Sequence, residues 1–206
     1  MEKSRDVWTI SYLLKWTINY FKSKGIESAR LDAEVLLSHV LGQKRIYLYV
    51  HFDEPMEAKE LAKFREYVAK RARHIPVAYI LGQREFMGLD FKVTKDTLIP
   101  RPDTEILVEN TIAKVNENFG DKQSYDIVDI GTGSGAIILS LLKNLPKAKG
   151  FTVDISANAV AVAKENAQNL QVDDRCEFFV GDLFEPVKDK VFDGIVSNPP
   201  DMPQKD

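Results

Sequence analysis

The seven residues from Asp129 to Gly135, Asp-Ile-Gly-Thr-Gly-Ser-Gly, constrain the fold of this chain more than any other stretch. They follow an apolar, strand-like run over residues 125–129 and precede an apolar helical pattern over residues 136–145. The three glycines allow a sharp turn and a close approach of the backbone to a ligand, where a side chain would clash. The loop therefore predicts a ligand at the carboxyl end of a strand in an open α/β sheet.

A second motif, Asn198-Pro199-Pro200, ends another strand-like run over residues 192–197. It places an amide side chain before two rigid prolines, which suits a polar clamp at the end of a strand. A simple strand-ending turn is the alternative interpretation. The upstream glycine loop favours the clamp, because ligand sites in open sheets gather at the carboxyl ends of strands.

Two acidic residues extend the same pattern. Asp154 ends a second strand-like run, 19 residues beyond Gly135, where a carboxylate can accept hydrogen bonds from ribose hydroxyls. Asp182 follows a third run, residues 176–180, and is placed to accept from an adenine amino group. The glycine loop has neither the triphosphate-binding nor the dinucleotide-binding spacing. Together these features predict a nucleoside pocket.

After Gly120 the strand-like and helical segments alternate in a βαβ pattern, which predicts a parallel sheet with right-handed crossovers. Before residue 80, three runs with helical spacing predict a small bundle over residues 7–21, 28–42 and 55–70. We expect Ser28 to cap the second helix, Pro55 to open the third, and Trp8 and Trp16 to lie in the core.

Residues 86–93 have the pattern of a short hairpin around Gly88, and residues 98–105 read Leu-Ile-Pro-Arg-Pro-Asp-Thr-Glu. The prolines predict a helix over residues 106–115 that is capped by Asp103 or Thr104. The segment is interpreted either as a rigid connector or as a substrate-side wall on which Arg101 offers a planar donor fork.

Composition sets the broad class. Apolar residues make up 44% and charged residues 29%, as in globular proteins, and no run approaches the roughly 20 apolar residues that span a bilayer. The one cysteine, Cys176, excludes an internal disulfide and is expected to be buried, which agrees with a reducing compartment and a cytoplasmic protein. The three histidines lack metal-site spacing, so no metal is expected.

Charge is distributed unevenly. Residues 1–83 contain 14 Lys/Arg and 10 Asp/Glu, a net charge of +4, whereas the remainder contains 14 and 21, a net charge of −7. A basic N-terminal part suits an acidic or RNA-bound partner, although solvated helix faces give the same count.

The motifs, taken in order, resemble those of class I S-adenosylmethionine-dependent methyltransferases. Residues 129–135, 153–156 and 181–184 and the Asn-Pro-Pro motif carry this resemblance. The stretch Ile-Pro-Arg-Pro-Asp-Thr-Glu at 99–105 is similar to the release-factor glutamine N5-methyltransferase family (HemK/PrmC type). A looser match to that family lies at Arg71, Arg73, Pro76, Tyr79, Ile80 and Gly82.

The resemblance implies an α/β fold: an N-terminal helical bundle followed by a doubly wound, mainly parallel, Rossmann-like methyltransferase domain. The implied divisions are a substrate-recognition domain (1–82), a hairpin and linker (83–105) and an S-adenosyl-L-methionine-binding domain (106–206). The implied cofactor-binding residues are Gly131, Thr132, Gly133, Ser134, Gly135, Asp154, Asp182, Leu183 and Asn198. Catalysis is assigned to Asn198 and Pro199, and substrate binding to Asn198, Pro199, Pro200, Asp201 and Arg101.

The reaction that this resemblance implies is methyl transfer to the side-chain nitrogen of a glutamine in a peptide chain release factor. No membrane association is expected, and the full-length protein is expected to be a monomer. Two alternatives stay open: a nucleic-acid amino-methyltransferase, which the acidic C-terminal part disfavours, and a non-catalytic cofactor-binding fragment.

Two departures from the family pattern stand out. Position 201 is Asp where the family has Tyr, which removes an aromatic wall from the substrate side. The chain also stops shortly after its fourth predicted strand. We therefore expect an N-terminal part of a longer protein, incomplete in its cofactor-binding domain and with the fourth strand as an exposed edge.

Overall fold

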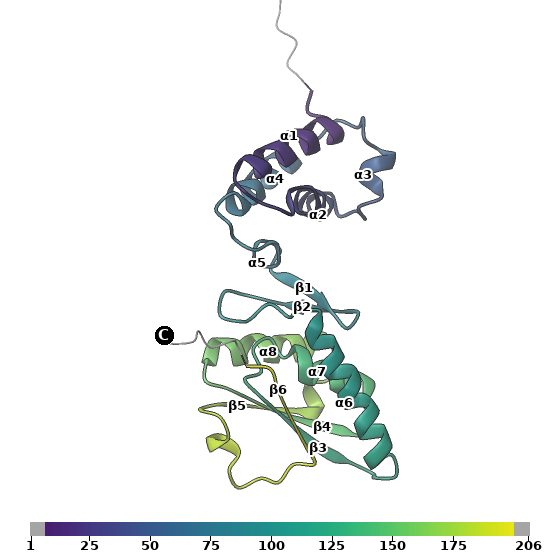
Figure 1. The fold of residues 1–206 in the computed structure, drawn as a ribbon, viewed down its shortest axis with the longest axis vertical. Coiled ribbons are helices and arrows are strands. Elements are labelled where there is room, and N and C mark those ends of the chain that lie inside the picture. Colours follow the sequence, from purple (N-terminus) through teal and green to yellow (C-terminus); the bar gives the residue numbers. More distant parts are fainter. Residues whose placement is uncertain (1–6, 200–206) are drawn as a thin grey trace, which may run out of the picture. The chain divides into compact units, whose positions relative to one another are not determined.

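The computed structural model describes residues 7–199, and its contacts divide the chain into two compact units with a boundary between Leu81 and Gly82. The first unit is helical, and the second contains the strands (Figure 1).

In its described part, residues 7–81, the helical unit contains five helices. They are α1 (Ile10–Ser23), α2 (Ala29–Leu41), α3 (Tyr47–Val50), α4 (Ala58–Arg71) and α5 (Val77–Leu81). The three predicted helices correspond to α1, α2 and α4. The short helices α3 and α5 were not predicted, because one turn of helix carries too little periodicity to recognise.

One predicted side-chain cap and one predicted helix start are wrong. Ser28 occupies the N-cap position of α2, but its hydroxyl donates to the Asp32 carboxylate at 2.8 Å instead of capping the helix. Helix α4 begins at Ala58, not at Pro55, because Glu57 and Glu60 form a reciprocal capping box there.

The core of the helical unit is formed by buried side chains such as Phe21, Leu36 and Phe64. The prediction that both tryptophans belong to this core is wrong for Trp16, whose exposed fraction is 46%. Trp16 lies beside the buried stripe of α1 and packs on Trp8 and Tyr20.

The second unit opens with an antiparallel hairpin, β1 (Gln83–Phe86) and β2 (Leu89–Lys92). Met87 and Gly88, the two turn residues, both have positive φ, at 52° and 69°. This is the backbone of a two-residue turn that matches strand twist, and the predicted hairpin is confirmed.

The main sheet has four parallel strands in the order β5-β4-β3-β6. Their bounds are β3 (Tyr125–Ile130), β4 (Ala148–Asp154), β5 (Cys176–Val180) and β6 (Gly194–Ser197). The helices are α6 (Asp103–Phe119), α7 (Ala136–Asn144) and α8 (Ala157–Asn169), and short 3₁₀ turns lie at Asp173–Arg175 and Glu185–Val187. The predicted α/β fold with a parallel sheet is confirmed.

Helix α6 begins earlier than predicted. Asp103 and Thr104 lie inside its first turn, and Pro102 occupies the N-cap position without a side-chain cap. The capping role predicted for Asp103 or Thr104 is therefore wrong, and the Thr104 hydroxyl is available for another contact.

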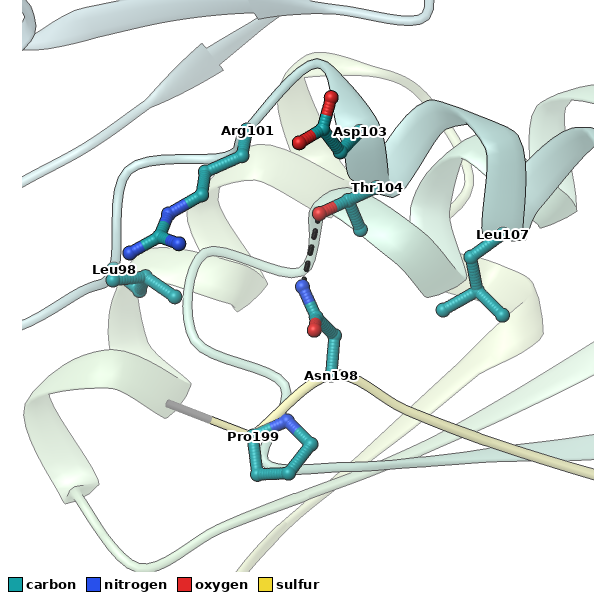
Figure 2. A pocket seen from close by; sticks show the side chains of 7 residues that line it. All are labelled: Leu98, Arg101, Asp103, Thr104, Leu107, Asn198 and Pro199. Atoms are coloured by element: carbon teal, nitrogen blue, oxygen red, sulfur yellow. Dashed lines mark hydrogen bonds between the residues drawn. The ribbon is translucent and has the colours of Figure 1, made fainter. Parts of the chain in front are cut away.

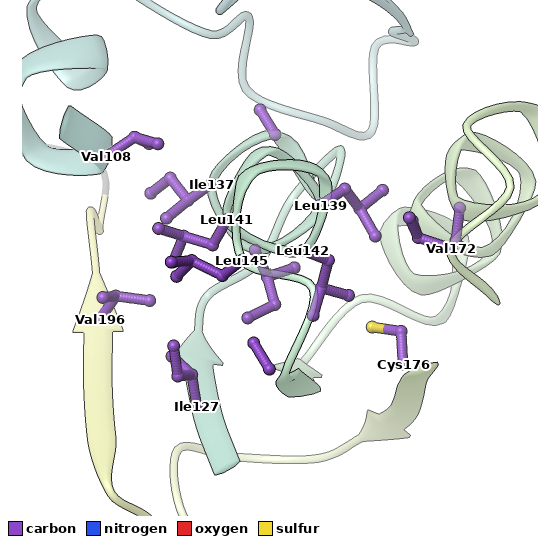
Figure 3. Packing of buried hydrophobic residues seen from close by; sticks show 14 of the residues in the cluster. Val108, Ile127, Ile137, Leu139, Leu141, Leu142, Leu145, Val172, Cys176 and Val196 are labelled. Atoms are coloured by element: carbon purple, nitrogen blue, oxygen red, sulfur yellow. The ribbon is translucent and has the colours of Figure 1, made fainter. Parts of the chain in front are cut away.

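The helices pack against one face of the sheet, where Ile127 and Val196 meet Ile137 and Leu141 of α7 (Figure 3). Side chains of alternate strand residues, such as Val128 and Val153, form a separate cluster on the other face. Cys176 is buried in the first cluster, and burial raises the pKa of its thiol to about 12. Cys176 is thus an inert packing residue, as predicted. Among the described residues, no helix has both the length and the apolar character to cross a membrane.

Candidate active site

The strand order places a ligand site at the carboxyl ends of β3 and β6. The chain runs from β3 outward to β4 and β5, and then returns to the opposite side of β3 to form β6. Ligands of open α/β sheets bind in the crevice at such a reversal. A cleft of about 370 Å³ lies there, lined by residues that follow all four strands.

Most of the predicted site residues line this one cleft: Gly131, Gly133, Asp154, Asp182, Leu183, Asn198 and Pro199. Thr132 and Ser134 are buried and line a small adjoining cavity, which Arg101 and Asn198 also line. Pro200 and Asp201 lie outside the described residues.

Gly135 has a different environment. Its φ is 81°, and a Cβ there would come within 2.9 Å of the Leu139 side chain. The absence of a side chain therefore lets α7 begin close to its neighbours, and Gly135 does not line the cleft. Gly131, with φ 77°, differs because a Cβ there would point into open space.

Asp154 supports the glycine loop as well as lining the cleft. Its carboxylate accepts from the backbone N–H of Gly133 at 2.8 Å and from that of Ser156 at 2.9 Å. A carboxylate has about four acceptor positions, so capacity remains for a ligand hydroxyl. Sequence reasoning assigned Asp154 to a ligand and missed its bond to the loop.

Asp129 lies behind the loop and is fully buried. One carboxylate oxygen accepts from the Thr132 hydroxyl at 2.9 Å, whereas Oδ1 has no hydrogen-bond partner among residues 7–199. Burial, together with the nearby charge of Asp154, raises the pKa of Asp129 to about 7, against the Thr132 hydrogen bond, which lowers it. No role was predicted for Asp129 from the sequence.

The cleft is acidic and has apolar edges. Asp96, Asp154 and Asp182 line it, and among residues 7–199 none of them forms a salt bridge. Ile155 and Leu183 line it too, and their exposed fractions are 76% and 61%. Such a surface complements a ligand that combines positive charge with a flat apolar ring.

Asn198 is held from two sides. The Ser197 hydroxyl donates to the carbonyl of Ile130 at 2.7 Å, which ties the end of β6 to the end of β3. The Asn198 amide nitrogen donates to the Thr104 hydroxyl at 2.9 Å, so its oxygen is turned away from Thr104 (Figure 2). Thr104 and Asn198 line a cavity of about 200 Å³, and Arg101 and Pro199 line it too.

Thr104 was missed as a site residue. Its place in the Pro-Arg-Pro-Asp-Thr-Glu segment was the available signal, but the sequence does not show that the segment reaches Asn198. The helix that carries Thr104 is itself fixed, because the neighbouring Glu105 accepts from the backbone N–H of Met87 at 2.7 Å.

Comparison with known families agrees with this geometry. Residues 104–206 match the family described as methyltransferase small domain, and residues 12–82 match the PrmC N-terminal domain. The class of protein that the fold and site define is thus a methyltransferase.

Curated relatives narrow the class. A release factor glutamine methyltransferase of Rhodopirellula baltica is 44% identical over 207 residues, covering all of this chain and 70% of that protein. One of Geobacter sulfurreducens is 46% identical over 206 residues, with the same coverage. The chain belongs to the release factor glutamine methyltransferase family. It spans about 70% of the length of these two relatives.

Among solved structures, a SAM dependent methyltransferase from Agrobacterium tumefaciens aligns at 17% identity with a TM-score of 0.48. The alignment covers 57% of this chain and 39% of that one, which is too partial to add to the assignment.

Proposed function

We propose that this chain transfers a methyl group from S-adenosyl-L-methionine to the side-chain N5 nitrogen of a glutamine in peptide chain release factors. One observation carries the proposal: Asn198 and Pro199 line the same cleft as Gly131, Gly133 and Asp154. A clamp for an amide group therefore opens directly onto the part of the cleft that suits a nucleoside.

The residues of the cleft fit this cofactor. The volume of about 370 Å³ lies in the range of small-molecule sites, and Gly131 faces open space. Asp154 would accept from the ribose hydroxyls and Asp182 from the adenine amino group, with Ile155 and Leu183 against the base. The loop from Gly131 to Gly135 would hold the remainder. When bound, the cofactor supplies a methyl group on a positively charged sulfur.

Asn198 and Pro199 would prepare the nitrogen that is methylated. An amide nitrogen is a poor nucleophile because its lone pair is delocalised into the carbonyl. The Asn198 side-chain oxygen and the Pro199 carbonyl can each accept one N–H, which fixes the nitrogen and favours the positive charge that develops on it. The Asn198–Thr104 bond leaves the required oxygen free.

No strong base is needed in this scheme, because the proton can leave after methyl transfer. In the described part of the chain, neither His nor Cys lines the cleft. We place Arg101 and Pro200 on the substrate side. Asp201 occupies the position at which the family has Tyr.

The helical unit is proposed as the recognition domain for the release factor, with residues 83–105 as the linker to the cofactor-binding domain. We propose a cytoplasmic protein that is monomeric at full length. The net charge of −7 beyond residue 83 is unfavourable for a nucleic-acid substrate, because duplex binding uses a broad basic face.

The test is incubation of the chain with methyl-labelled cofactor and a release factor, followed by mass-spectrometric mapping. We expect label on one glutamine. Asn198→Ala should lower the rate about 100-fold, because it removes an acceptor that acts on developing charge. Asn144→Ala is the matched control, since within residues 7–199 the Asn144 amide donates to the carbonyl of Ser140 in its own helix and does not line the cleft. Labelled DNA or RNA with an unlabelled release factor would contradict the proposal.

A further inference from the structure

A groove of about 370 Å³ lies between α1 and α4 in the helical unit, apart from the cleft already described. Its floor is formed by buried side chains, among them Leu13, Phe64 and Val68. Helices α1 and α4 thus leave an apolar channel open between them at the surface.

Each edge of the groove is one row of side chains. On α4 the row is Leu61, Arg65 and Ala69, spaced four residues apart, and the small Ala69 leaves its end open. On the α1 side the row is aromatic. Trp16 stacks on Tyr20 with ring centroids 5.2 Å apart and meets Trp8 edge-on at 6.2 Å. The rows run for about 12 Å, enough for two helical turns of a partner.

The floor also contains an unused polar group. Thr17 is fully buried and lines the groove, and its hydroxyl has no hydrogen-bond partner among the described residues. A threonine inside a helix normally donates to the carbonyl four residues earlier. Because this hydroxyl is fully buried, it offers no surface to a bound segment and plays no part in binding one.

The charge around the groove is positive. Helix α1 contains no acidic residue. Arg65 lines the groove and forms no salt bridge within residues 7–199. Lys24 lies 5.4 Å from the centre of the Tyr20 ring, and Arg73 donates to the carbonyl of Ala69. Glu57, which precedes Leu61 in the α4 row, is engaged in the capping box of α4.

We propose that this groove binds a segment of the release factor in which apolar side chains alternate with acidic ones. The apolar side chains would lie against the tryptophans, and the carboxylates would face Arg65 and the two flanking cations. The inference rests on the proposed function for its partner. RNA is less well matched, because Trp16 already stacks on Tyr20 and only one cation lines the groove.

Binding in the groove can be followed through the tryptophan side chains. The chain has two tryptophans, Trp8 and Trp16, and both line the groove. In the ¹⁵N-labelled chain their two indole N–H signals therefore report on the groove alone. Unlabelled release factor whose target glutamine is replaced should shift or broaden both signals. Poly(U) RNA and S-adenosylmethionine should leave them unchanged.

Charge reversal on α4 supplies the paired variants. Arg65→Glu should weaken binding of the release factor at least tenfold by calorimetry. Lys59→Glu, the same change at an exposed position of the same helix outside the groove, should bind within twofold of the unaltered chain.

The inference and the proposed function fail in different ways. If the release factor is methylated but the indole signals do not move, or if Arg65→Glu binds it normally, the proposed role of the groove is contradicted. The proposed function is not affected by that result. Indole shifts with poly(U) but not with the release factor would also overturn the groove assignment. Shifts with the release factor but no methylated glutamine would support the groove and contradict the function.

Discussion

Buried carboxylates in the helical unit are paired with cations, whereas those at the strand ends of the second unit are not. Glu34, with an exposed fraction of 2%, accepts from Arg30 at 3.0 Å, from Arg45 at 2.5 Å and from the Tyr49 hydroxyl. Burial alone would raise the pKa of Glu34, but these hydrogen bonds hold it below its ordinary value. Asp129 is buried more completely and receives one hydroxyl.

This difference in pairing distinguishes acids that stabilise the fold from acids that can bind a ligand. A buried acid whose hydrogen bonds and countercharge come from its own unit stabilises the fold and has little left for a ligand. An acid at a strand end that is not fully buried, and that has no salt bridge among residues 7–199, keeps its charge available for a ligand. Asp154 and Asp182 are of the second kind, and both line the cleft.

Removing the charge of Glu34 tests whether the buried ion pairs of the helical unit stabilise its fold. Glu34→Gln leaves Arg30 and Arg45 without their countercharge, and we expect the free energy of unfolding to fall by about 2 kcal/mol. Affinity for S-adenosylmethionine should not change. Urea unfolding followed by circular dichroism measures the first quantity, and calorimetry the second.

Glu66→Gln is the control, because Glu66 pairs with Lys63 and Lys70 on the exposed face of α4. It should unfold close to the unaltered chain. Equal stability of the Glu34 and Glu66 variants would show that the buried network is not structural.

Thr104→Val tests the role of the hydrogen bond that Thr104 accepts from Asn198 at the end of β6. The variant keeps the shape of the side chain but releases the Asn198 amide, so the oxygen is no longer held toward the substrate. We expect kcat to fall about tenfold, equivalent to about 1.4 kcal/mol, with KM for the release factor nearly unchanged. Thr104→Ser should restore most of the loss.

Thr111→Val is the matched control on the same helix, since the Thr111 hydroxyl donates to the carbonyl of Leu107. Normal turnover in Thr104→Val, or a serine variant as slow as the valine variant, would remove Thr104 from the positioning of Asn198.

Asp129 gives a prediction of a different kind, a dependence of stability on pH. Its pKa of about 7 in the folded chain lies above the ordinary value of 3.8, so its contribution to stability is complete below pH 4 and is lost as pH rises through about 7. Relative to Asp129→Asn, which does not titrate, the unaltered chain should lose stability steadily across this window. Parallel stability curves for the two chains would contradict the burial of an unpaired carboxylate.

The sequence predicted the parts of the site that depend on strand ends. The sequence has glycines after β3, acids at the ends of β4 and β5, and an amide after β6. Because the carboxyl ends of parallel strands lie at one edge of the sheet, these residues could be predicted to converge there. The helical runs were recognised from periodicity. The start of α4 was not, because the reciprocal hydrogen bonds of Glu57 and Glu60 set it at Ala58, and apolar spacing does not reveal such bonds.

The contacts between distant segments could not be predicted. The pairing of Thr104 with Asn198 joins residues 94 positions apart, and the bond from Gly133 to Asp154 depends on how the loop folds back. The exposure of Trp16 likewise depends on how closely α1 and α4 pack. These features arise from packing geometry, on which a periodic pattern carries no information.

Calorimetric titration of S-adenosylmethionine into Asp182→Ala tests most directly whether acids without an internal partner form the ligand site. Asp182 is exposed in the cleft, and the control, Asp189→Ala, removes an equally exposed acid outside it. We expect the affinity to fall about tenfold in the first variant, the loss of one hydrogen bond to a charged acceptor, and to stay unchanged in the second. Equal affinity in both variants would contradict the account.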